Sequence, residues 1–153
     1  MNNTTFIMLK PDAKEKELVS TILDELQNHG CTIIKQQEVA VTPTLILKHY
    51  QDVLERVSIP NFKDRILKEF NQQIVTIAIL THPTKDVINY VRELVGATEP
   101  TKADPNSIRG KYADDDYERS SKEDRLVRNL IHASDSKESA IAEINLWFNS
   151  TGL

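Results

Sequence analysis

Residues 72–82, QQIVTIAILTH, carry the strongest strand signal in the chain and decide the fold. Apolar and β-branched side chains, which favour β-strands, follow one another from Ile74 to Leu80 with little interruption. A strand with one face in water alternates polar and apolar residues, whereas this run is apolar on both faces. The sequence therefore predicts that residues 72–82 form a central strand covered on both sides.

Strands and helices alternate on either side of this strand. Residues 16–30 place Leu18, Ile22 and Leu26 at helical spacing before a glycine, which predicts an amphipathic helix, and residues 85–96 repeat the pattern. Further strands are predicted at residues 4–10, 31–41 and 129–134, and further helices at 43–50, 53–57 and 62–70. This order predicts an α+β fold of ferredoxin-like type, a four-stranded antiparallel sheet (βαββαβ) with helices packed on it.

The last third of the chain is less regular. Residues 97–127 contain prolines and many charges but no periodic apolar pattern, which predicts one long loop. A final helix is predicted to begin at Asp135 as the N-cap, with Glu138 three residues later as in a capping box. The residues that this helix is expected to bury are Ala140, Ile141, Ile144, Trp147 and Phe148.

Composition and charge limit the class of protein. A chain of 153 residues, 39% hydrophobic and 27% charged, is typical of a globular protein, and we expect a single domain over residues 1–153. The net charge of −4 offers no general attraction to nucleic acid or to an anionic membrane. No apolar run approaches the roughly 18 residues of a membrane span, and no signal-peptide pattern is present. The single cysteine, Cys31, excludes an internal disulfide and favours a cytoplasmic location.

Several functional motifs are absent from the sequence. With four glycines in the chain, neither a P-loop nor a dinucleotide-binding GxGxxG motif is present. The histidines at positions 29, 49, 82 and 132 lack metal-ligand spacing, so no zinc site is predicted. Ser134, Asp135 and Ser136 follow His132 directly, whereas the members of a catalytic triad come from separate chain segments.

Three cations stand at or near the ends of predicted elements. Lys10 closes the first strand, Arg92 lies on the helix at residues 85–96, and Arg109 lies in the predicted loop. A phosphate bound without a glycine-rich backbone cradle would need side chains such as these. Taken singly, each is more commonly a solvated surface cation, so the pattern alone leaves a phosphate site open.

His132 also has two interpretations. A lone histidine at a strand end is more commonly structural than catalytic. However, it precedes a predicted helix N-terminus, which favours a nearby anion, and the small residues Ala133 and Ser134 leave room beside the ring. Glu143, farther along that helix, is either an ordinary exposed residue or a carboxylate that orients the imidazole and raises its nucleophilicity.

Three separated segments together resemble the nucleoside diphosphate kinase family. They are TFIMLKPDA at residues 5–13, VGATEP…IRG at 95–110 and RNLIHASDSKESAIAEINLWF at 128–148, in the family's order. The resemblance implies a ferredoxin-like fold and transfer of the γ-phosphate of a nucleoside triphosphate, typically ATP, to a nucleoside diphosphate. It further implies a phosphohistidine intermediate, ping-pong kinetics, and Mg²⁺ bridged by the nucleotide phosphates rather than held in a protein cage.

The resemblance also implies a role for each matching residue. His132 would accept and return the phosphoryl group, with Glu143 as its orienting carboxylate. Lys10 and Tyr50 would complete the catalytic set, and Ser134 would lie close to the nucleophile. Asn129 would contact the sugar hydroxyl together with Lys10. The implied nucleotide-binding residues are Lys10, Phe62, Arg92, Thr98, Arg109 and Asn129.

The chain departs from the family pattern at several positions. Ala13 and Ala133 stand where the family usually has glycine, and both replacements are small. The aromatic residue that stacks on the base should fall near Ser58 or Ile59, where the chain has no ring. We predict that Phe62 takes that position.

Residues 112–126 form an insertion relative to most family members. They are expected to act as a lid over the nucleotide, as an oligomer contact or as a passive polar loop. A lid predicts that deletion of Asp114–Asp124 raises the KM for nucleotides.

The expected partners are nucleoside tri- and diphosphates with broad base and sugar tolerance, and further copies of the chain in a dimer-based tetramer or hexamer. No membrane and no nucleic acid are expected. The alternative function is a nucleotide-binding regulatory or scaffold protein of the same fold without turnover. The presence of Lys10 together with His132 favours the enzyme.

Overall fold

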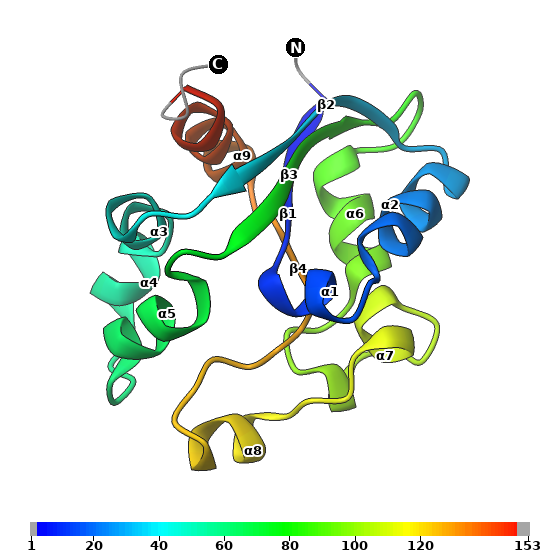
Figure 1. The fold of residues 1–153 in the computed structure, drawn as a ribbon. Helices are drawn as coiled ribbons and strands as arrows, with labels where there is room; N and C mark the ends of the chain where they lie inside the picture. The colour runs from blue at the N-terminus through cyan, green and yellow to red at the C-terminus, as the bar shows by residue number, and fades with distance from the viewer. Residues whose placement is uncertain (1–2, 150–153) are drawn as a thin grey trace.

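The computed structural model describes residues 3–149, which form a four-stranded sheet with helices on both faces (Figure 1). In chain order the elements are β1 (Thr4–Leu9), α1 (Pro11–Glu15), α2 (Val19–Asn28), β2 (Thr32–Ala40), α3 (Pro43–His49), α4 (Gln51–Arg56), α5 (Phe62–Phe70), β3 (Ile74–Thr81), α6 (Val87–Val95), the 3₁₀ helix η1 (Pro100–Lys102), α7 (Ile108–Tyr112), α8 (Tyr117–Lys122), β4 (Ile131–Ala133), α9 (Lys137–Ile144) and the π-helix η2 (Asn145–Asn149). The strand order is β2-β3-β1-β4, and every neighbouring pair is antiparallel. The predicted fold class is confirmed.

The central position predicted for residues 72–82 is also confirmed. β3 lies between β1 and β2, and its pairing with β1 runs from Thr4 opposite Thr81 to Leu9 opposite Thr76. Ile77 is fully buried, because helices cover both faces of the sheet at this point. The apolar run of β3 therefore reflects burial on two sides rather than one.

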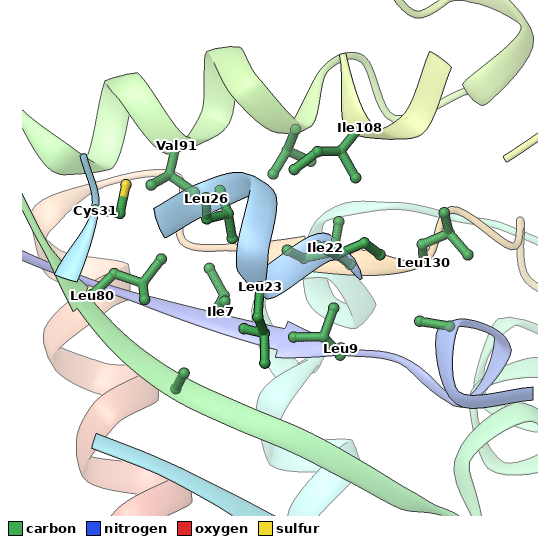
Figure 2. Packing of buried hydrophobic residues seen from close by; sticks show 14 of the residues in the cluster. Ile7, Leu9, Ile22, Leu23, Leu26, Cys31, Leu80, Val91, Ile108 and Leu130 are labelled. Carbon is green, nitrogen blue, oxygen red and sulfur yellow. The ribbon is translucent and has the colours of Figure 1, made fainter. Parts of the chain in front are cut away.

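Helices α2 and α6 cover one face of the sheet, where an aliphatic core forms (Figure 2). Ile7 and Leu9 of β1 meet Ile22 and Leu26 of α2 and Val91 of α6, and all five are at most 1% exposed. Burial of each such side chain stabilises the fold by about 1.5–3 kcal/mol relative to its exposure. This layer anchors β1 and α6, which both lead into the site described below.

The opposite face, which is covered by α3, α5, α9 and η2, has a core that mixes aromatic and aliphatic side chains. Phe6 and Met8 of β1 point to this side, since successive side chains of a strand alternate between faces. The rings of Phe6 and Trp147 are stacked with centroids 6.2 Å apart, and Phe70 and Phe148 complete the cluster. The histidine rings discussed below pack against this layer.

The prediction of one long loop at residues 97–127 is wrong, because this segment contains η1, α7 and α8. Ser107 caps α7 by accepting a hydrogen bond from the Gly110 amide at 3.1 Å. Asp116 caps α8 in the same way, accepting from the Arg119 amide at 2.6 Å. Helices of five and six residues are too short to show an apolar stripe, so their caps were the remaining signal.

The last helix begins one residue later than predicted. Its N-cap is Ser136, whose hydroxyl accepts from the Ser139 amide at 3.0 Å, whereas the Asp135 carboxylate accepts from the Ser139 hydroxyl at 2.6 Å. The prediction that Ile141 is buried is wrong, since it is 55% exposed. It lies about 100° around the helix from the buried Ala140 and therefore faces away from the sheet. The other residues predicted to be buried do pack in the core.

Candidate active site

A pocket of about 630 Å³ opens at the end of the sheet where β1 ends and β4 begins. Its walls come from the α3–α5 region, from the C-terminal end of α6 with the segment that follows, and from residues 117–127. The sequence-predicted residues that line it are Lys10, Tyr50, Phe62, Arg92, Thr98, Arg109, Asn129, His132 and Glu143. Ser134 is fully buried and does not line the pocket. The structure thus brings residues from distant parts of the chain to one cavity.

Glu143 of α9 points back at His132 of β4. Its Oε2 lies 3.0 Å from His132 Nε2, and its Oε1 accepts a 2.5 Å hydrogen bond from the Ser134 hydroxyl. Ser134 is fixed in turn, since its amide donates to the Phe6 carbonyl at 3.0 Å. The carboxylate is therefore held in place by Ser134, the residue that follows β4, and lies against the ring.

The contact between His132 and Glu143 is close but is not aligned as a hydrogen bond, and the buried Nε2 has no hydrogen-bond partner. Catalytic hydrogen bonds are often poorly aligned before substrate binds. A carboxylate beside Nε2 favours the neutral tautomer that carries its proton there, which leaves a lone pair on Nδ1. The His132 side chain is 26% exposed and lines the pocket, so this arrangement supplies an accessible nitrogen nucleophile.

Lys10 and Asn129 form a buried pair on the pocket wall. Lys10 Nζ donates to Asn129 Oδ1 at 2.8 Å, and Asn129 Nδ2 donates to the Thr98 carbonyl at 3.0 Å. Lys10 is 5% exposed, and burial lowers the pKa of its ammonium group. Lys10 and Asn129, which the family resemblance assigns jointly to the sugar hydroxyl, are therefore in direct contact.

Arg109 is held in a fixed orientation by backbone carbonyls. Its guanidinium donates to the carbonyls of Gly96 at 3.0 Å, Asn129 at 3.2 Å and Ile131 at 2.5 Å. Burial lowers its pKa to about 10, and the neighbouring Arg92 acts in the same direction. Arg92 and Thr98 also line the pocket, and both are exposed. The pocket therefore carries one partly buried and one exposed guanidinium.

Tyr50 contacts a second histidine, which in turn contacts His132. Its ring lies 5.1 Å from that of His49, and the His49 ring lies 4.5 Å from that of His132. Phe62 packs edge-on against Tyr50 at 6.2 Å and lines the pocket. Burial raises the pKa of Tyr50, so its hydroxyl stays protonated and can donate a hydrogen bond.

Sequence reasoning missed two groups of residues around His132. Asp12 is 3% exposed, and its Oδ2 accepts from the Leu130 amide at 2.9 Å. Leu130 has a φ of 72°, a conformation that is strained for a branched side chain and must be held by its surroundings. Asp12 therefore restrains Leu130, which lies two residues before His132. Its position next to Lys10 in the KPD segment was the available signal.

The second missed group is His49 with Trp147. Trp147 Nε1 donates to His49 Nδ1 at 3.0 Å, and the two rings lie 5.6 Å apart. The two residues are separated by 98 positions, so spacing in the sequence could not connect them. His49 was weighed only as a possible metal ligand.

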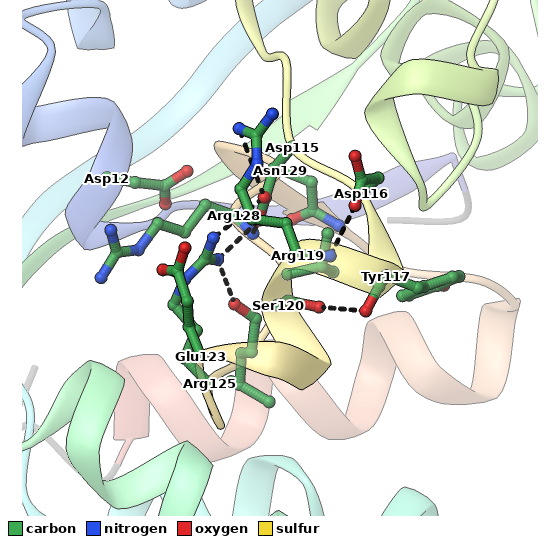
Figure 3. A network of polar contacts seen from close by, with 12 residues as sticks. Asp12, Asp115, Asp116, Tyr117, Arg119, Ser120, Glu123, Arg125, Arg128 and Asn129 are labelled. Carbon is green, nitrogen blue, oxygen red and sulfur yellow. Dashed lines mark hydrogen bonds and ion pairs between the residues drawn. The ribbon is translucent and has the colours of Figure 1, made fainter.

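A network of ion pairs fixes residues 112–126 (Figure 3). The Arg125 guanidinium contacts Asp115 through two hydrogen bonds of 2.6 and 3.0 Å, and both residues are at most 7% exposed. Although burial alone would raise the pKa of Asp115, hydrogen bonds from Arg125 and the Arg128 amide lower it to about 2. Asp124 joins this segment to α5 through Arg65 at 2.8 Å. The segment is therefore an ordered wall of the pocket.

Comparison with known proteins gives a consistent result. A family model described as "Nucleoside diphosphate kinase" matches residues 3–153. The chain is 36% identical over 151 residues to the nucleoside diphosphate kinase of Methanosphaera stadtmanae, covering 99% of this chain and 89% of that protein. It is 34% identical to the nucleoside diphosphate kinase of Streptococcus pneumoniae, covering 94% of this chain and 98% of that protein.

Solved structures agree with these sequence relatives. A transition-state mimic of the nucleoside diphosphate kinase from Borrelia burgdorferi, with bound vanadate and ADP, superposes with a TM-score of 0.89 at 27% identity. That alignment covers 98% of this chain and 89% of the other. The Aquifex aeolicus nucleoside diphosphate kinase superposes with a TM-score of 0.78 at 33% identity, covering 94% of this chain and 93% of that one.

Proposed function

The chain belongs to the nucleoside diphosphate kinase family, and on this premise we propose that His132 carries the phosphoryl group between the two nucleotides. As a member of this family the protein is a phosphotransferase that acts on nucleotides. The observation that carries the proposal is the contact between Glu143 and the Nε2 of a histidine that lines a cation-bearing pocket.

The reaction has two half-reactions. The Nδ1 lone pair of His132 attacks the γ-phosphorus of a nucleoside triphosphate, the bond to the β-phosphate oxygen breaks, and a nucleoside diphosphate leaves. A terminal phosphate oxygen of the acceptor diphosphate then attacks the phosphohistidine, and the phosphorus–nitrogen bond breaks. Glu143 holds the Nε2 proton throughout and stabilises the charge that develops on the ring. Ping-pong kinetics follow.

The positive side chains of the pocket form no covalent bond in this reaction. Phosphoryl transfer requires mainly positioning and neutralisation of charge on the phosphate oxygens. Lys10, Arg92 and Arg109 would bind those oxygens, with the Thr98 hydroxyl as a further donor. Asn129, already in contact with Lys10, would bind the sugar hydroxyl. Tyr50 would donate its hydroxyl near the transferred group.

Mg²⁺ would enter this pocket with the nucleotide rather than bind in a cage of protein carboxylates. Mg²⁺ prefers oxygen ligands, yet the carboxylates that line the pocket, Asp52, Asp135 and Glu143, include one that is committed to Ser134 and the nucleophile. The residues thus offer cations for phosphate rather than an acidic cage for metal. When bound, Mg²⁺ would neutralise charge on the phosphates.

The base would stack on Phe62 at the outer end of the pocket. Ile59 and Leu126 line the same cavity and would supply apolar contacts, whereas Ser58 does not line it. Apolar stacking without a directed hydrogen bond discriminates weakly between bases. We therefore expect broad nucleotide tolerance.

Residues 112–126 would act as a wall that closes the nucleotide end of the pocket, in one domain with the remainder of residues 1–153. Tyr117, Ser120 and Arg125 line the cavity together with the catalytic residues. Deletion of Asp114–Asp124 would remove the partner of the buried Arg125 and so confound folding with binding. The sharper variant is Tyr117→Ala, because this side chain is 48% exposed. It should raise the KM for nucleotides with kcat unchanged.

We also propose a dimer-based homo-oligomer and a cytoplasmic location. β2 is an edge strand that exposes Ile34 to 44%, and an apolar side chain on a free edge favours pairing with another copy. In residues 3–149, the helices are too short or too polar to cross a membrane. Light scattering after size-exclusion chromatography would give the assembly state.

The deciding experiment labels the protein with γ-³²P-ATP and Mg²⁺. The expected product is an acid-labile, base-stable phosphate on the wild-type chain that is discharged by added nucleoside diphosphate. His132→Ala should take up no label, while His82→Ala, which changes a histidine outside the pocket, should label normally. Equal label in His132→Ala would overturn the role of His132. Absence of label in the wild type would favour the nucleotide-binding scaffold.

A further inference from the structure

His49 lies between the proposed nucleophile and the aromatic core. Its ring stands nearly perpendicular to that of His132, at 81° and 4.5 Å, and it also contacts Phe6 at 6.4 Å. On its other side it accepts the 3.0 Å hydrogen bond from Trp147 Nε1. The reaction scheme above gives no task to this ring.

The partner on Nδ1 determines the chemical state of His49. An indole nitrogen is a donor only, so His49 Nδ1 must present a lone pair. The neutral ring then carries its proton on Nε2. An imidazolium would place a second N–H against the indole N–H, so His49 can be protonated only if the Trp147 bond breaks. The hydrogen bond therefore holds His49 neutral by geometry.

The neutrality of His49 matters because of Glu143. Ligand atoms of His49, His132 and Glu143 all lie within 4.8 Å of one another. The Glu143 carboxylate is therefore close enough to interact with either imidazole. A charged His49 would attract Glu143 away from the Nε2 of His132. The other charged group that faces His49 is Lys10, and burial together with the charges of His132 and Lys10 keeps the pKa of His49 well below its ordinary value.

We propose that His49 is a positioning residue for phosphoryl transfer: Trp147 locks it as a neutral ring, and this reserves Glu143 for His132. The inference rests on the proposed role of His132 as nucleophile and adds a reason why that histidine, rather than its neighbour, has the carboxylate.

A metal site is the competing interpretation of the same cluster. Two imidazoles and a carboxylate are a common ligand set for zinc. However, His49 Nδ1 is already occupied by a donor, and a metal on Nε2 as well would require an imidazolate. The Trp147 contact therefore opposes a metal ion and supports a neutral positioning ring.

The direct test is the tautomer of His49. A two-bond ¹H–¹⁵N correlation spectrum of the unphosphorylated protein, assigned with His49→Asn, distinguishes the two neutral tautomers and the imidazolium. We expect His49 to be neutral with its proton on Nε2 at neutral pH, and to remain neutral below the ordinary pKa of histidine. In Trp147→Phe the restraint on Nδ1 is gone, so the same signals should titrate at a higher pH than in the wild type.

The functional test compares three variants in single-turnover phosphorylation by ATP–Mg²⁺ over a range of pH. Trp147→Phe leaves His49 Nδ1 open to a proton, so its rate should fall more steeply than that of the wild type as the pH is lowered, by up to about tenfold, as for a lost orienting partner. His49→Asn keeps a carbonyl acceptor for Trp147 but cannot ionise. The double variant should therefore lose the extra acid dependence, whereas a simple packing defect would persist in it.

Three results would overturn the proposal: a proton on His49 Nδ1 in the wild type, an unchanged pH profile in Trp147→Phe, or the same acid loss in the double variant. These failures are distinct from failure of the proposed function, because the tautomer is measured without turnover. Label that stays on the protein in His132→Ala, by contrast, would refute the nucleophile and leave the tautomer result standing.

Discussion

His82 and His132 lie at opposite extremes of what a partly buried histidine can do. His82, just after β3, accepts at Nδ1 from the amides of Thr84 at 3.2 Å and Lys85 at 3.1 Å, and its Nε2 lies 3.1 Å from the His29 carbonyl. Every polar atom of that ring is engaged by backbone. His132 has a carboxylate beside one nitrogen, no hydrogen bond on it, and a pocket in front of it.

The partners of the ring nitrogens determine which of the two histidines can react with a substrate. A nitrogen whose lone pair is already bonded and buried cannot attack a substrate, whereas a lone pair that faces an open pocket can. His82 stabilises a turn, whereas His132 lines the pocket, and Glu143 beside its Nε2 leaves the lone pair on Nδ1.

Replacement of the two histidines should have opposite consequences. His132→Ala removes the attacking atom and should lower kcat by at least about 10⁴-fold, as loss of a covalent nucleophile does in other enzymes. His82→Ala should leave kcat/KM within about threefold of the wild type, because its contacts lie outside the pocket. A coupled assay with ATP and a nucleoside diphosphate measures both. Comparable losses in both variants would erase the distinction.

The stability of the fold should show the reverse order. His82→Ala leaves the amides of Thr84 and Lys85 and the His29 carbonyl without their partner, which should cost about 2–3 kcal/mol of unfolding free energy. His132→Ala should cost less than about 1 kcal/mol, because no hydrogen bond of Nε2 is lost. Urea denaturation of both variants gives the comparison, and a more destabilised His132→Ala would contradict it.

Glu143→Gln should weaken the nucleophile without removing it. The amide keeps the shape of the side chain but cannot stabilise a positive ring, so kcat should fall by about 10–100-fold with little change in KM. Glu138→Gln, on the same helix but exposed and outside the pocket, is the matched control and should retain full kcat. A change in KM alone would assign Glu143 to nucleotide binding instead.

His49 adds a third histidine, and its linkage to pH should be visible in stability. Because burial holds its folded pKa well below the ordinary value, the unfolded chain takes up the proton first. The contribution of His49 to stability is therefore complete above about pH 6.5 and is lost as pH falls below it, by up to about 1.4 kcal/mol per pH unit. Urea denaturation between pH 7.5 and 5.5 should show a shallower decline for His49→Asn than for the wild type. Parallel declines would remove His49 as the cause.

Ser134→Ala should give the smallest effect. It removes the hydroxyl that donates to Glu143 Oε1 at 2.5 Å, and a single hydrogen bond of this kind contributes about 1 kcal/mol, or about fivefold in rate. If Ser134 acts by holding the carboxylate, Ser134→Thr should recover part of the lost kcat. Recovery of neither rate nor stability would indicate a packing defect.

The fold was predictable because its central elements have simple patterns. β3 is apolar on both faces because both are covered, and α2 and α6 show a single apolar stripe because only one side packs. The short helices α7 and α8 were missed, since each depends on one capping side chain. Ile141 was predicted to be buried because it is apolar, but the spacing of apolar residues in α9 does not show which side of the helix faces the sheet.

The site was predictable where two residues that the family resemblance pairs lie in direct contact. Lys10 and Asn129, and likewise His132 and Glu143, were paired through the family resemblance and do meet. His49 could not be predicted, because its state depends on a hydrogen bond from Trp147 across the core. A residue whose role is set by a distant donor has no local sequence signal.

The pairing of β1 with β4 has a consequence for biosynthesis. Met8 lies opposite His132, so the strand that begins the fold receives its last neighbour only after more than a hundred further residues have been added. Chains are made and begin to fold from the N-terminus, and such long-range pairings form late. Until β4 has been synthesised, β1 therefore keeps one edge unpaired, and Lys10 lacks its hydrogen bond to Asn129. A nascent chain from which β4 has not yet emerged has an incomplete pocket, and its unpaired sheet edge can pair with another chain.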